Sequence, residues 1–307
     1  MKQLKATVIM PTFSSERFDD TLQAVSSLMK QTHTDKELIV VVDRNKPLYD
    51  KLTDALPKSV RLFLSTQPGP SNARNLGIQH ATGDVIAFID DDIIVEKTWL
   101  SKLLRNYRDP NVLGVGGTIR PMWYDPSQAK FPREIYWILG CTDPAYFEKT
   151  HEVRNNYGGN TSFRRDVLER VTFSASFQNV DGKTRGIEDA EMSIRLLSEY
   201  PNHVILHDPE AIAYHRVYPV RTSLAYILRR AYTEGLGKAY ITRLHKKSLA
   251  RERFYLHDLL LHYLPTRLKE AVRNNDSTSR SNALILLLVM FGTATGYGIG
   301  TLQNRLS

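Results

Sequence analysis

Apolar and polar stretches alternate regularly through the first half of the chain. Four apolar runs rich in β-branched residues predict strands, and these are Lys5–Met10, Glu37–Asp43, Val60–Ser65 and Asp84–Ile89. Amphipathic stretches between the runs predict three helices, and these are Asp19–Lys30, Pro47–Ala55 and Pro70–His80. Strands that alternate with helices in this way predict an α/β fold with a mostly parallel sheet and helices on both faces.

Polar residues follow these runs at the sheet edge where α/β folds bind ligands. They are Pro11 and Thr12 after the first run, Asp43 at the end of the second, and Asp90, Asp91 and Asp92 after the fourth. The chain has no GxGxxG sequence after the first run and no GxxxxGK[ST] sequence anywhere. A dinucleotide-binding Rossmann site and a P-loop ATPase are therefore disfavoured.

The acidic triplet is a candidate metal site. Side chains alternate along an extended chain, so Asp90 and Asp92 are expected to point to the same side and share one cation. Their hard oxygen ligands favour Mg²⁺ or Mn²⁺ over zinc. Three adjacent carboxylates would also repel one another unless a cation or a basic partner neutralised them. A solvated acidic turn is the structural alternative.

The stretch Gln67–Asn75 predicts a turn that runs into a helix. Pro70 favours the first helical turn, and Ser71 and Asn72 are candidate caps for it. The free N–H groups of such a helix, together with Arg74, would suit an anion such as a nucleotide phosphate. An ordinary capped helix is the alternative interpretation.

The C-terminal stretch Ala283–Leu302 holds 20 residues without a charge. As a helix it would be about 30 Å long, close to the thickness of a bilayer core, so we expect a membrane-spanning or membrane-embedded helix. Gly292, Gly296 and Gly300 share one helical face and are a possible surface for self-association. A buried C-terminal helix is the alternative. The N-terminus lacks a signal-peptide pattern, so we expect the catalytic part on the cytoplasmic side of the cell membrane.

The distribution of charge sharpens this interpretation. The 307 residues include 41 Lys and Arg and 33 Asp and Glu, a net charge of +8. Residues 216–280 hold 14 of these basic residues and 5 of the acidic ones, so the basic excess lies next to the apolar segment. Anionic lipid headgroups are the favoured partner, and nucleic acid is disfavoured because no recognised binding motif is present. The single cysteine, Cys141, excludes a disulfide framework and a thiolate zinc site.

The series PTF, VVD, GPSNARNLG and the acidic triplet resembles the family-2 inverting glycosyltransferases of the GT-A fold, over about residues 5–220. The resemblance implies that Asp90 and Asp92 hold a metal on the diphosphate of a nucleotide sugar. It also implies that Pro11 and Asp43 contact the base and the ribose. The family's second strand ends in DDGS, whereas this chain has DRNK, so only Asp43 carries over.

The second half supplies further positions that match this family. The acidic pair Glu188-Asp189 opens a predicted helix, and the resemblance implies that Asp189 is the catalytic base. Without the resemblance, such acidic residues are equally typical partners of the helix dipole. His215 matches a late metal ligand in relatives, although a structural histidine is the alternative. Residues 158–164 resemble the family's acceptor-side loop, and a plain β-turn is the alternative.

Two stretches point to a narrower group. EIYWILG with Cys141, and EVRNNYGGNTSFR, are similar to archaeal dolichyl-phosphate glucuronosyltransferases of protein N-glycosylation. That resemblance implies UDP-glucuronate as donor and a dolichyl- or polyprenyl-phosphate-linked glycan as acceptor. Candidate partners for the donor carboxylate are Arg120, Arg154, Arg164 and Arg185. Candidate residues for stacking on a sugar are Trp123, Tyr136 and Trp137, which could equally be core or membrane-interface residues.

The preferred hypothesis is a membrane-attached, metal-dependent inverting glycosyltransferase that transfers glucuronate to a lipid-linked glycan. We expect a catalytic domain at residues 1–218, a basic helical region at 219–281 and the apolar helix at 282–302. One alternative keeps the fold and moves glucose, mannose or rhamnose onto another lipid or a polysaccharide. A non-enzyme alternative is a basic membrane-docking module. The sequence around Arg229 and Arg230 lacks the tryptophan of the QxxRW signature, which disfavours a processive polymerase.

Overall fold

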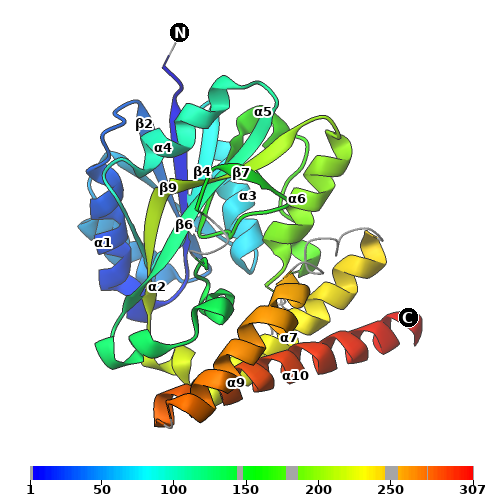
Figure 1. Cartoon of the computed structure of the whole chain (residues 1–307). Helices are drawn as coiled ribbons and strands as arrows, with labels where there is room; N and C mark the ends of the chain where they lie inside the picture. The colour runs from blue at the N-terminus through cyan, green and yellow to red at the C-terminus, as the bar shows by residue number, and fades with distance from the viewer. Residues whose placement is uncertain (1–2, 144–147, 178–185, 246–254, 275, 307) are drawn as a thin grey trace. The chain divides into compact units, whose positions relative to one another are not determined.

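The structure is a computed structural model that describes residues 3–143, 148–177, 186–245, 255–274 and 276–306. The four predicted strands are present as β1 (Ala6–Thr12), β2 (Lys36–Asp43), β3 (Val60–Ser65) and β4 (Val85–Ile89) (Figure 1). The three predicted helices are present as α1 (Phe18–Met29), α2 (Lys46–Ala55) and α3 (Pro70–His80). The alternating apolar pattern therefore predicted the positions of β1 to β4 and α1 to α3.

These four strands form one half of a larger sheet. β1 lies between β2 and β4, β3 pairs with β2, and all three pairings are parallel. The register aligns Ile9 with Ile39 on one side and with Phe88 on the other. The carboxyl ends of β1, β2 and β4 therefore meet at one edge of the sheet, as the sequence predicted.

The rest of the sheet adds antiparallel pairings to the parallel ones, and the α/β fold class is as the sequence predicted. The further strands are β5 (Ile93–Val95), β6 (Val112–Trp123), β7 (His151–Val153), β8 (Asn160–Arg164) and β9 (Val204–Val217). β8 runs antiparallel to β4 and to β6, while β9 runs antiparallel to β5 and β7. Among the described residues the strand order is β3-β2-β1-β4-β8-β6-β9-β5, with β7 paired to β9. The sheet is therefore mixed.

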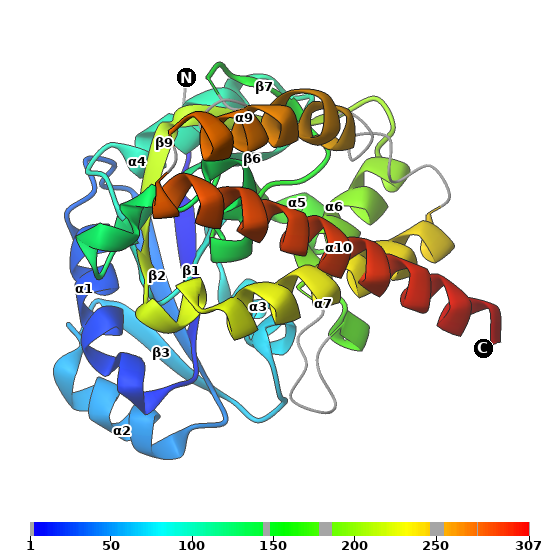
Figure 2. The ribbon, with the colours of Figure 1, turned by 60° about the horizontal axis from the view of Figure 1, so that its bottom comes forward.

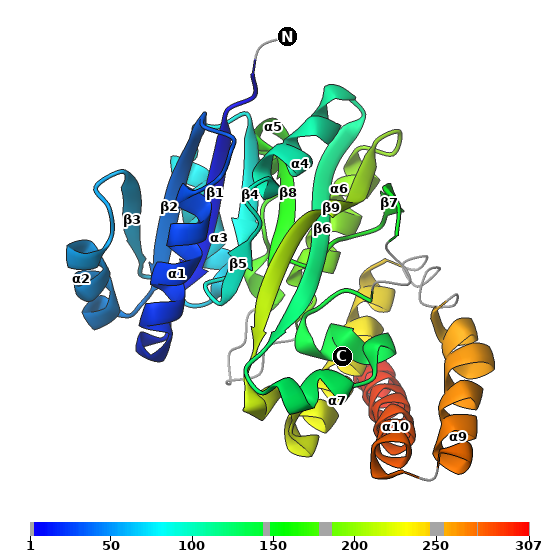
Figure 3. The same ribbon diagram turned by 60° about the vertical axis from the view of Figure 1, so that its left-hand side comes forward.

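Helices cover both faces of this sheet (Figure 3). One face packs against α1, α2 and α4 (Trp99–Arg105), and Val8, Val40 and Ala87 contribute to that core. The other face packs against α3, α5 (Arg165–Leu168) and α6 (Glu188–Glu199), and Ile9, Ile39 and Phe88 contribute there. Adjacent strand residues thus enter opposite cores, which explains why β4 and the middle of β2 are apolar at every position.

The chain divides into two compact units, and the described residues of each form contacts mainly within it. The first comprises residues 1–120, 144–183 and 188–216, and the second comprises 121–143, 184–187 and 217–307. The segment 121–143, which we expected in the catalytic domain, thus groups with the C-terminal helices. Short helices in the first unit are η1 (Ser15–Arg17), η2 (Asn106–Arg108) and η6 (Ala175–Phe177).

The second unit is helical and has its own core. Its elements are η3 (Pro126–Lys130), η4 (Arg133–Leu139), η7 (Pro219–Thr222), α7 (Leu224–Leu244), the π-helical turn η8 (Leu259–Tyr263), α9 (Leu264–Arg273) and α10 (Ser277–Leu306). Within it, α10 lies between α7 and α9 (Figure 2). Ile138, Ala231 and Leu286 meet in the core of this unit. Trp137 donates a hydrogen bond from Nε1 to the Tyr255 hydroxyl at 3.1 Å, which gives Trp137 a packing role.

The glycine face of α10 packs against α7 of the same chain. A Cβ atom on Gly296 would clash with the carbonyl oxygen of Tyr232, and one on Gly300 would approach the Ala239 side chain. Gly292 faces Ala231 in the same way. This face is therefore occupied within the chain, which corrects the expectation that it is a surface for self-association. The close spacing that small residues allow is used for intramolecular packing instead.

α10 is also the apolar helix that the sequence predicted. Within Ser277–Asn304 an 18-residue window has a mean hydropathy of 1.8, and among the described residues this is the one helix long and apolar enough to cross a membrane. Only 28% of its most apolar window is buried inside the structure. The core helix of a water-soluble protein would be mostly buried, so this low fraction leaves much apolar surface exposed.

The α7–α10 contact makes a prediction about stability. Gly296→Val should lower the free energy of unfolding by roughly 1–3 kcal/mol, because its side chain has no room beside Tyr232. A Cβ atom on Gly298 would meet nothing within 4 Å, so Gly298→Ala is the matched control and should leave the thermal unfolding midpoint unchanged or slightly higher. Equal midpoints for the two variants would contradict the close packing of these helices.

Candidate active site

Helix α3 delivers Arg74 to the edge of the sheet. The helix begins at Pro70 directly after Gly69, whose φ of 92° is in the left-handed region that glycine tolerates. Gly69 is the N-cap residue, and neither Ser71 nor Asn72 caps the helix, which corrects the sequence-based expectation. The Asn72 side chain instead donates a hydrogen bond from Nδ2 to the carbonyl oxygen of Pro68 at 2.9 Å.

The guanidinium of Arg74 lies among three carboxylates. It is 3.3 Å from Asp90, 3.6 Å from Glu188 and 3.4 Å from Asp189, and only 5% of the Arg74 side chain is exposed. Burial lowers the pKa of Arg74, but attraction to the three carboxylates outweighs this effect and raises the pKa above its ordinary value. We expected Arg74 to face a phosphate. In the structure its guanidinium forms ion pairs with these three carboxylates.

Asp189 is the best-placed candidate base in this cluster. One of its oxygens accepts a hydrogen bond from the backbone N–H of Gly158 at 2.9 Å, and the other faces Arg74. Burial raises the pKa of Asp189 to about 7, and repulsion from Glu188 and Asp90 adds to this, while the Arg74 charge acts in the opposite direction. A carboxylate with a pKa near neutrality is suited to accept a proton under physiological conditions.

Gly158 and Gly159 form the turn that holds these acids in place. A Cβ atom on Gly158 would overlap the Asp189 carboxylate, and one on Gly159 would lie 2.8 Å from Asp90 Oδ2. The next residue, Asn160, is buried and anchors the turn through Nδ2, which donates to the carbonyl oxygens of Thr118 at 3.1 Å and Ala211 at 3.0 Å. The double glycine therefore allows backbone to approach both acids closely.

The other two acids of the triplet are neutralised by a second arginine. Arg17 Nη1 is 2.7 Å from Asp91 and 3.1 Å from Asp92, and Thr12 donates a hydrogen bond from its hydroxyl to Asp91 at 2.7 Å. Burial raises the pKa of Asp91 to about 6, although Arg17 lowers it. Thr12 and Asp91 are only 2% and 3% exposed, which favours a supporting role for both over direct contact with a nucleotide.

Asp92 and His215 are brought together, as a shared metal site would require. His215 pairs with Ile93 across the β5–β9 ladder, and its Nε2 is 3.3 Å from Asp92 Oδ1. Adjacent ligands at about 2.1 Å from one octahedral cation lie about 3 Å apart, so this pair fits Mg²⁺ or Mn²⁺. Carboxylate and imidazole are also suitable donors for Mn²⁺.

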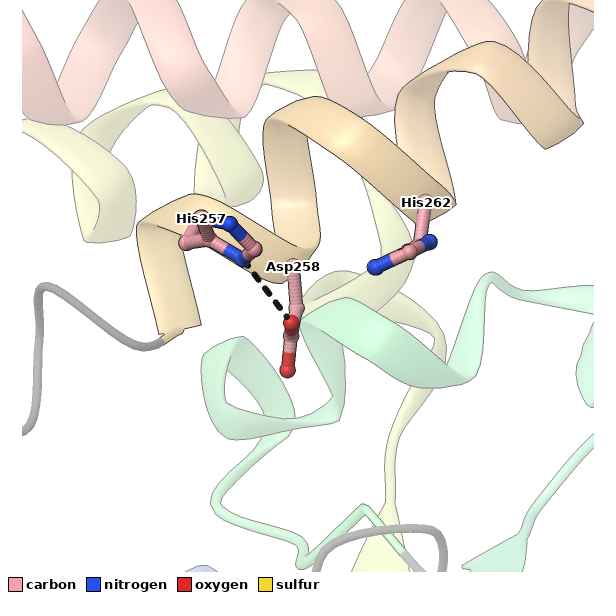
Figure 4. A group of neighbouring side chains, drawn as sticks. All are labelled: His257, Asp258 and His262. Atoms are coloured by element: carbon pink, nitrogen blue, oxygen red, sulfur yellow. Dashed lines mark hydrogen bonds and ion pairs between the residues drawn. The ribbon is translucent and has the colours of Figure 1, made fainter.

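Asp90 is the exposed member of the triplet, with 38% of its side chain accessible. It lies beside Arg74 rather than in a compact group with Asp92 and His215. Among the described residues, the one group of three such ligands within 4.8 Å of one another is His257, Asp258 and His262. That group lies on a helix of the second unit, where a hydrogen bond joins His257 to Asp258 (Figure 4).

The remaining nucleotide-site candidates surround the ends of β1 and β2. Asp43, at the end of β2, accepts a hydrogen bond from the Gly69 backbone N–H at 2.7 Å. Pro11 lies near the end of β1 and is half-buried. The sequence DRNK, which differs from the DDGS of the family, contains Asn45. The Asn45 side chain caps α2 by accepting a hydrogen bond from Leu48 N–H, and it donates one to the Phe13 carbonyl oxygen at 2.9 Å. Asn45 therefore ties the β1 and β2 loops together.

The arginine candidates for a donor carboxylate have different environments. Arg164 pairs in register with Val85, at the amino end of β4 and so at the opposite end of this strand from Asp90. Its guanidinium donates to the carbonyl oxygens of Val112, Tyr107 and Asp109, which makes Arg164 a structural residue and corrects its candidacy. Arg154 is half-buried beside Asn155, Arg120 is exposed on β6, and Arg185 lies outside the described residues.

Sequence reasoning missed two residues that organise this site. Arg17 lies just before α1 and gave no signal, because its acidic partners are more than 70 positions away. Phe173 supports the Arg74 guanidinium with its ring at 5.3 Å, and its backbone exchanges two hydrogen bonds with the Asn75 side chain. The roles of both residues depend on tertiary contacts, which no local sequence motif predicts.

Comparison with known proteins identifies the family. The family model for glycosyl transferase family 2 matches residues 7–172, more than half of the chain. This chain belongs to glycosyltransferase family 2. The matched region includes the Arg74 helix, the acidic triplet and the double-glycine turn, and it ends before Glu188 and Asp189.

Two curated proteins are similar to this glycosyltransferase over most of its length. A glucosyl-dolichyl phosphate glucuronosyltransferase from Haloferax volcanii is 32% identical over 300 residues, which cover 96% of this chain and 95% of that protein. The succinoglycan biosynthesis protein ExoM from Rhizobium meliloti is 26% identical over 228 residues, covering 73% of this chain and 71% of its own.

A solved structure supports the fold of this glycosyltransferase. A mannosyltransferase from Pyrobaculum calidifontis, solved in complex with GDP-mannose and Mn²⁺, superposes with a TM-score of 0.63. The alignment covers 99% of this chain and 88% of that one at 15% identity. The likeness confirms the expected GT-A type of fold.

The raised pKa of Asp189 predicts the pH dependence of this glycosyltransferase. A base acts only when deprotonated, so kcat/KM should fall about tenfold per pH unit below about pH 7 and level off above it. Asp189→Asn should lower kcat by at least about 10²-fold and leave UDP affinity within a few-fold of the parent. Turnover of Asp189→Asn close to that of the parent would remove Asp189 as the base.

The double-glycine turn generates a second prediction. Gly158→Ala should lower kcat while nucleotide affinity changes little, because its methyl group would displace the Asp189 carboxylate. Single-turnover rates and UDP titration separate the two effects. Gly298→Ala, in open space on α10, is the control for a glycine substitution that touches nothing. An unchanged kcat for Gly158→Ala would show that the turn does not position the base.

Proposed function

We propose that this chain is a membrane-attached, metal-dependent, inverting glucuronosyltransferase that acts on a dolichyl- or polyprenyl-phosphate-linked glycan. The proposed reaction type rests on one cluster of side chains. In this cluster Arg74 forms ion pairs with Asp90, Glu188 and Asp189. The similarity to a glucosyl-dolichyl phosphate glucuronosyltransferase over 96% of the chain supports the choice of donor and acceptor.

The proposed reaction is a single displacement. A sugar hydroxyl of the acceptor attacks the anomeric carbon of the donor, the bond from that carbon to the diphosphate oxygen breaks, and UDP leaves. Asp189 accepts the proton of the attacking hydroxyl, which is too weakly acidic to react unaided. The Gly158 N–H and Arg74 keep the carboxylate in one orientation, so little reorganisation is needed as the proton moves.

A divalent cation, Mg²⁺ or Mn²⁺, would stabilise the charge that develops on the departing diphosphate. Asp92 and His215 are the residues that would hold it, and Asp90 is the exposed carboxylate nearest to them in sequence. Asp43 and Pro11 would contact the nucleoside, since they lie at the ends of the two neighbouring strands.

Arg120 is the proposed partner of the donor carboxylate. Gly116 of β6 pairs with Thr161, which follows the double-glycine turn by two residues. Arg120 comes four residues after Gly116 on the same strand, so it lies past this turn along β6. Its exposed guanidinium would form a charge-assisted pair with glucuronate, an interaction that a neutral glucose cannot make.

A donor panel tests this proposal. Purified full-length protein in detergent should transfer glucuronate from UDP-glucuronate to glucosyl polyprenyl phosphate, and EDTA should abolish transfer until Mn²⁺ or Mg²⁺ is restored. Arg120→Gln should lower kcat/KM for UDP-glucuronate by about 10-fold or more relative to UDP-glucose, since one charged pair is lost. Preference of the parent enzyme for UDP-glucose or GDP-mannose would reject the donor and keep the family. EDTA-resistant transfer would reject metal dependence.

A further inference from the structure

The exposed side of α10 is a continuous apolar stripe. Its large exposed side chains follow helical spacing along one side of the helix and are Leu284, Leu287, Phe291, Ile299 and Leu302. Ala294 and Gly298 are also exposed and fill the interval between Phe291 and Ile299. From its first to its last leucine the stripe is about 27 Å long and holds no charged residue.

The opposite side of α10 is fixed along its length to α7. Gly292 faces Ala231, Gly296 faces Tyr232, and Gly300 faces Ala239, so the contacts advance in step along both helices. The Asn304 side chain continues this contact by donating to the Ala239 carbonyl at 3.1 Å. Any orientation of α10 relative to a membrane therefore applies to α7 as well.

α7 carries ionic groups level with the middle of the apolar stripe. Glu234 is 3.7 Å from Arg230 and 3.3 Å from Lys238, and these residues flank Gly235, which packs against Gly296. If α10 crossed a bilayer, its midpoint near Gly292 would lie at the centre of the hydrocarbon. Arg230, Glu234 and Lys238 would then be carried into the region where charged side chains are least tolerated.

We propose that α10 lies in the plane of the membrane surface, with its apolar stripe in the lipid and α7 on its aqueous side. This arrangement buries the apolar stripe of α10 in lipid and leaves the ionic groups of α7 hydrated. Neither helix then has a group in an unfavourable environment. It is the arrangement of an interfacial helix rather than of a spanning one. The proposal rests on the membrane attachment proposed above and specifies its geometry.

The charge around the stripe favours an anionic lipid surface as the occupant. The segment that precedes the apolar stripe, residues 216–280, has 14 basic and 5 acidic residues. Exposed cations stand before the stripe at Lys269, Arg273 and Arg280. Basic residues beside an apolar face increase binding to anionic headgroups, each contact adding to the binding that apolar burial provides.

Sidedness of labelling tests the orientation directly. Ser281→Cys and Gln303→Cys place a thiol at each exposed end of α10, and Ser59→Cys marks the side of the catalytic unit. Each variant is treated with a membrane-impermeant maleimide in sealed right-side-out and inside-out vesicles from expressing cells. The parent protein, whose Cys141 is buried, sets the background.

An in-plane helix predicts that both ends of α10 react from the same side as Ser59→Cys. Reaction of Ser281→Cys and Gln303→Cys from opposite sides would overturn the proposal and establish a spanning helix. This readout does not use catalysis. If both ends of α10 are labelled from the same side but no glucuronate is transferred, only the proposed activity is rejected. If glucuronate is transferred but the two ends are labelled from opposite sides, only the proposed orientation is rejected.

Vesicle flotation tests the occupant of the stripe. Full-length protein is mixed with phosphatidylcholine vesicles with or without phosphatidylglycerol, and Phe291→Glu should lower the bound fraction at least tenfold. Met29→Glu is the matched control, since Met29 is an exposed apolar residue on α1 of the other unit, and it should bind as the parent does. Parent-like flotation of Phe291→Glu would overturn lipid as the occupant. A change only in its oligomeric state would assign the stripe to self-association instead.

Discussion

The buried guanidinium of Arg74 is the interaction on which the site depends. A cation that is 5% exposed is stable in a protein only when carboxylates surround it, and here Asp90, Glu188 and Asp189 do so. These acids come from the end of β4 and the start of α6, about 100 residues apart in the chain. The same contacts that stabilise Arg74 therefore bring the candidate reactive groups together. Removal of any one acid would change the charge balance felt by the others.

Much of the first half of the fold follows from the sequence because its signals are local. β1 to β4 are apolar runs buried on both faces, and the polar residues that end them gather at one edge because the strands are parallel. The position of the triplet after β4 was therefore predictable. The order and direction of the later strands were not predictable, because β8 and β9 pair with strands distant in sequence and their register has no local signature.

The same distinction applies to the site residues. The acids and Arg74 stand out in motifs, but the direction in which Arg74 acts depends on α6 docking beside α3. The supporting positions are less visible still. Arg17 neutralises Asp91 and Asp92 from a loop with no recognisable pattern, and the role of Gly158 becomes clear only when the Asp189 carboxylate is seen against its backbone. Motifs located the candidate reactive groups, and tertiary contacts determine the pKa values and the orientation of these side chains.

The ion pair between Glu134 and Arg267 has a consequence for where the polypeptide can be divided. Glu134 is completely buried, and Arg267 of α9 binds it through two bonds of 2.7 and 3.0 Å. A chain shortened after residue 218, at the apparent end of the catalytic sequence, would retain Glu134 and lose its counter-ion. It would also leave Ile135 and Ile138 without the helices that cover them. The C-terminal helices thus complete the fold of a segment that lies, in sequence, between two strands of the catalytic sheet, and the catalytic half is not a separable piece of sequence.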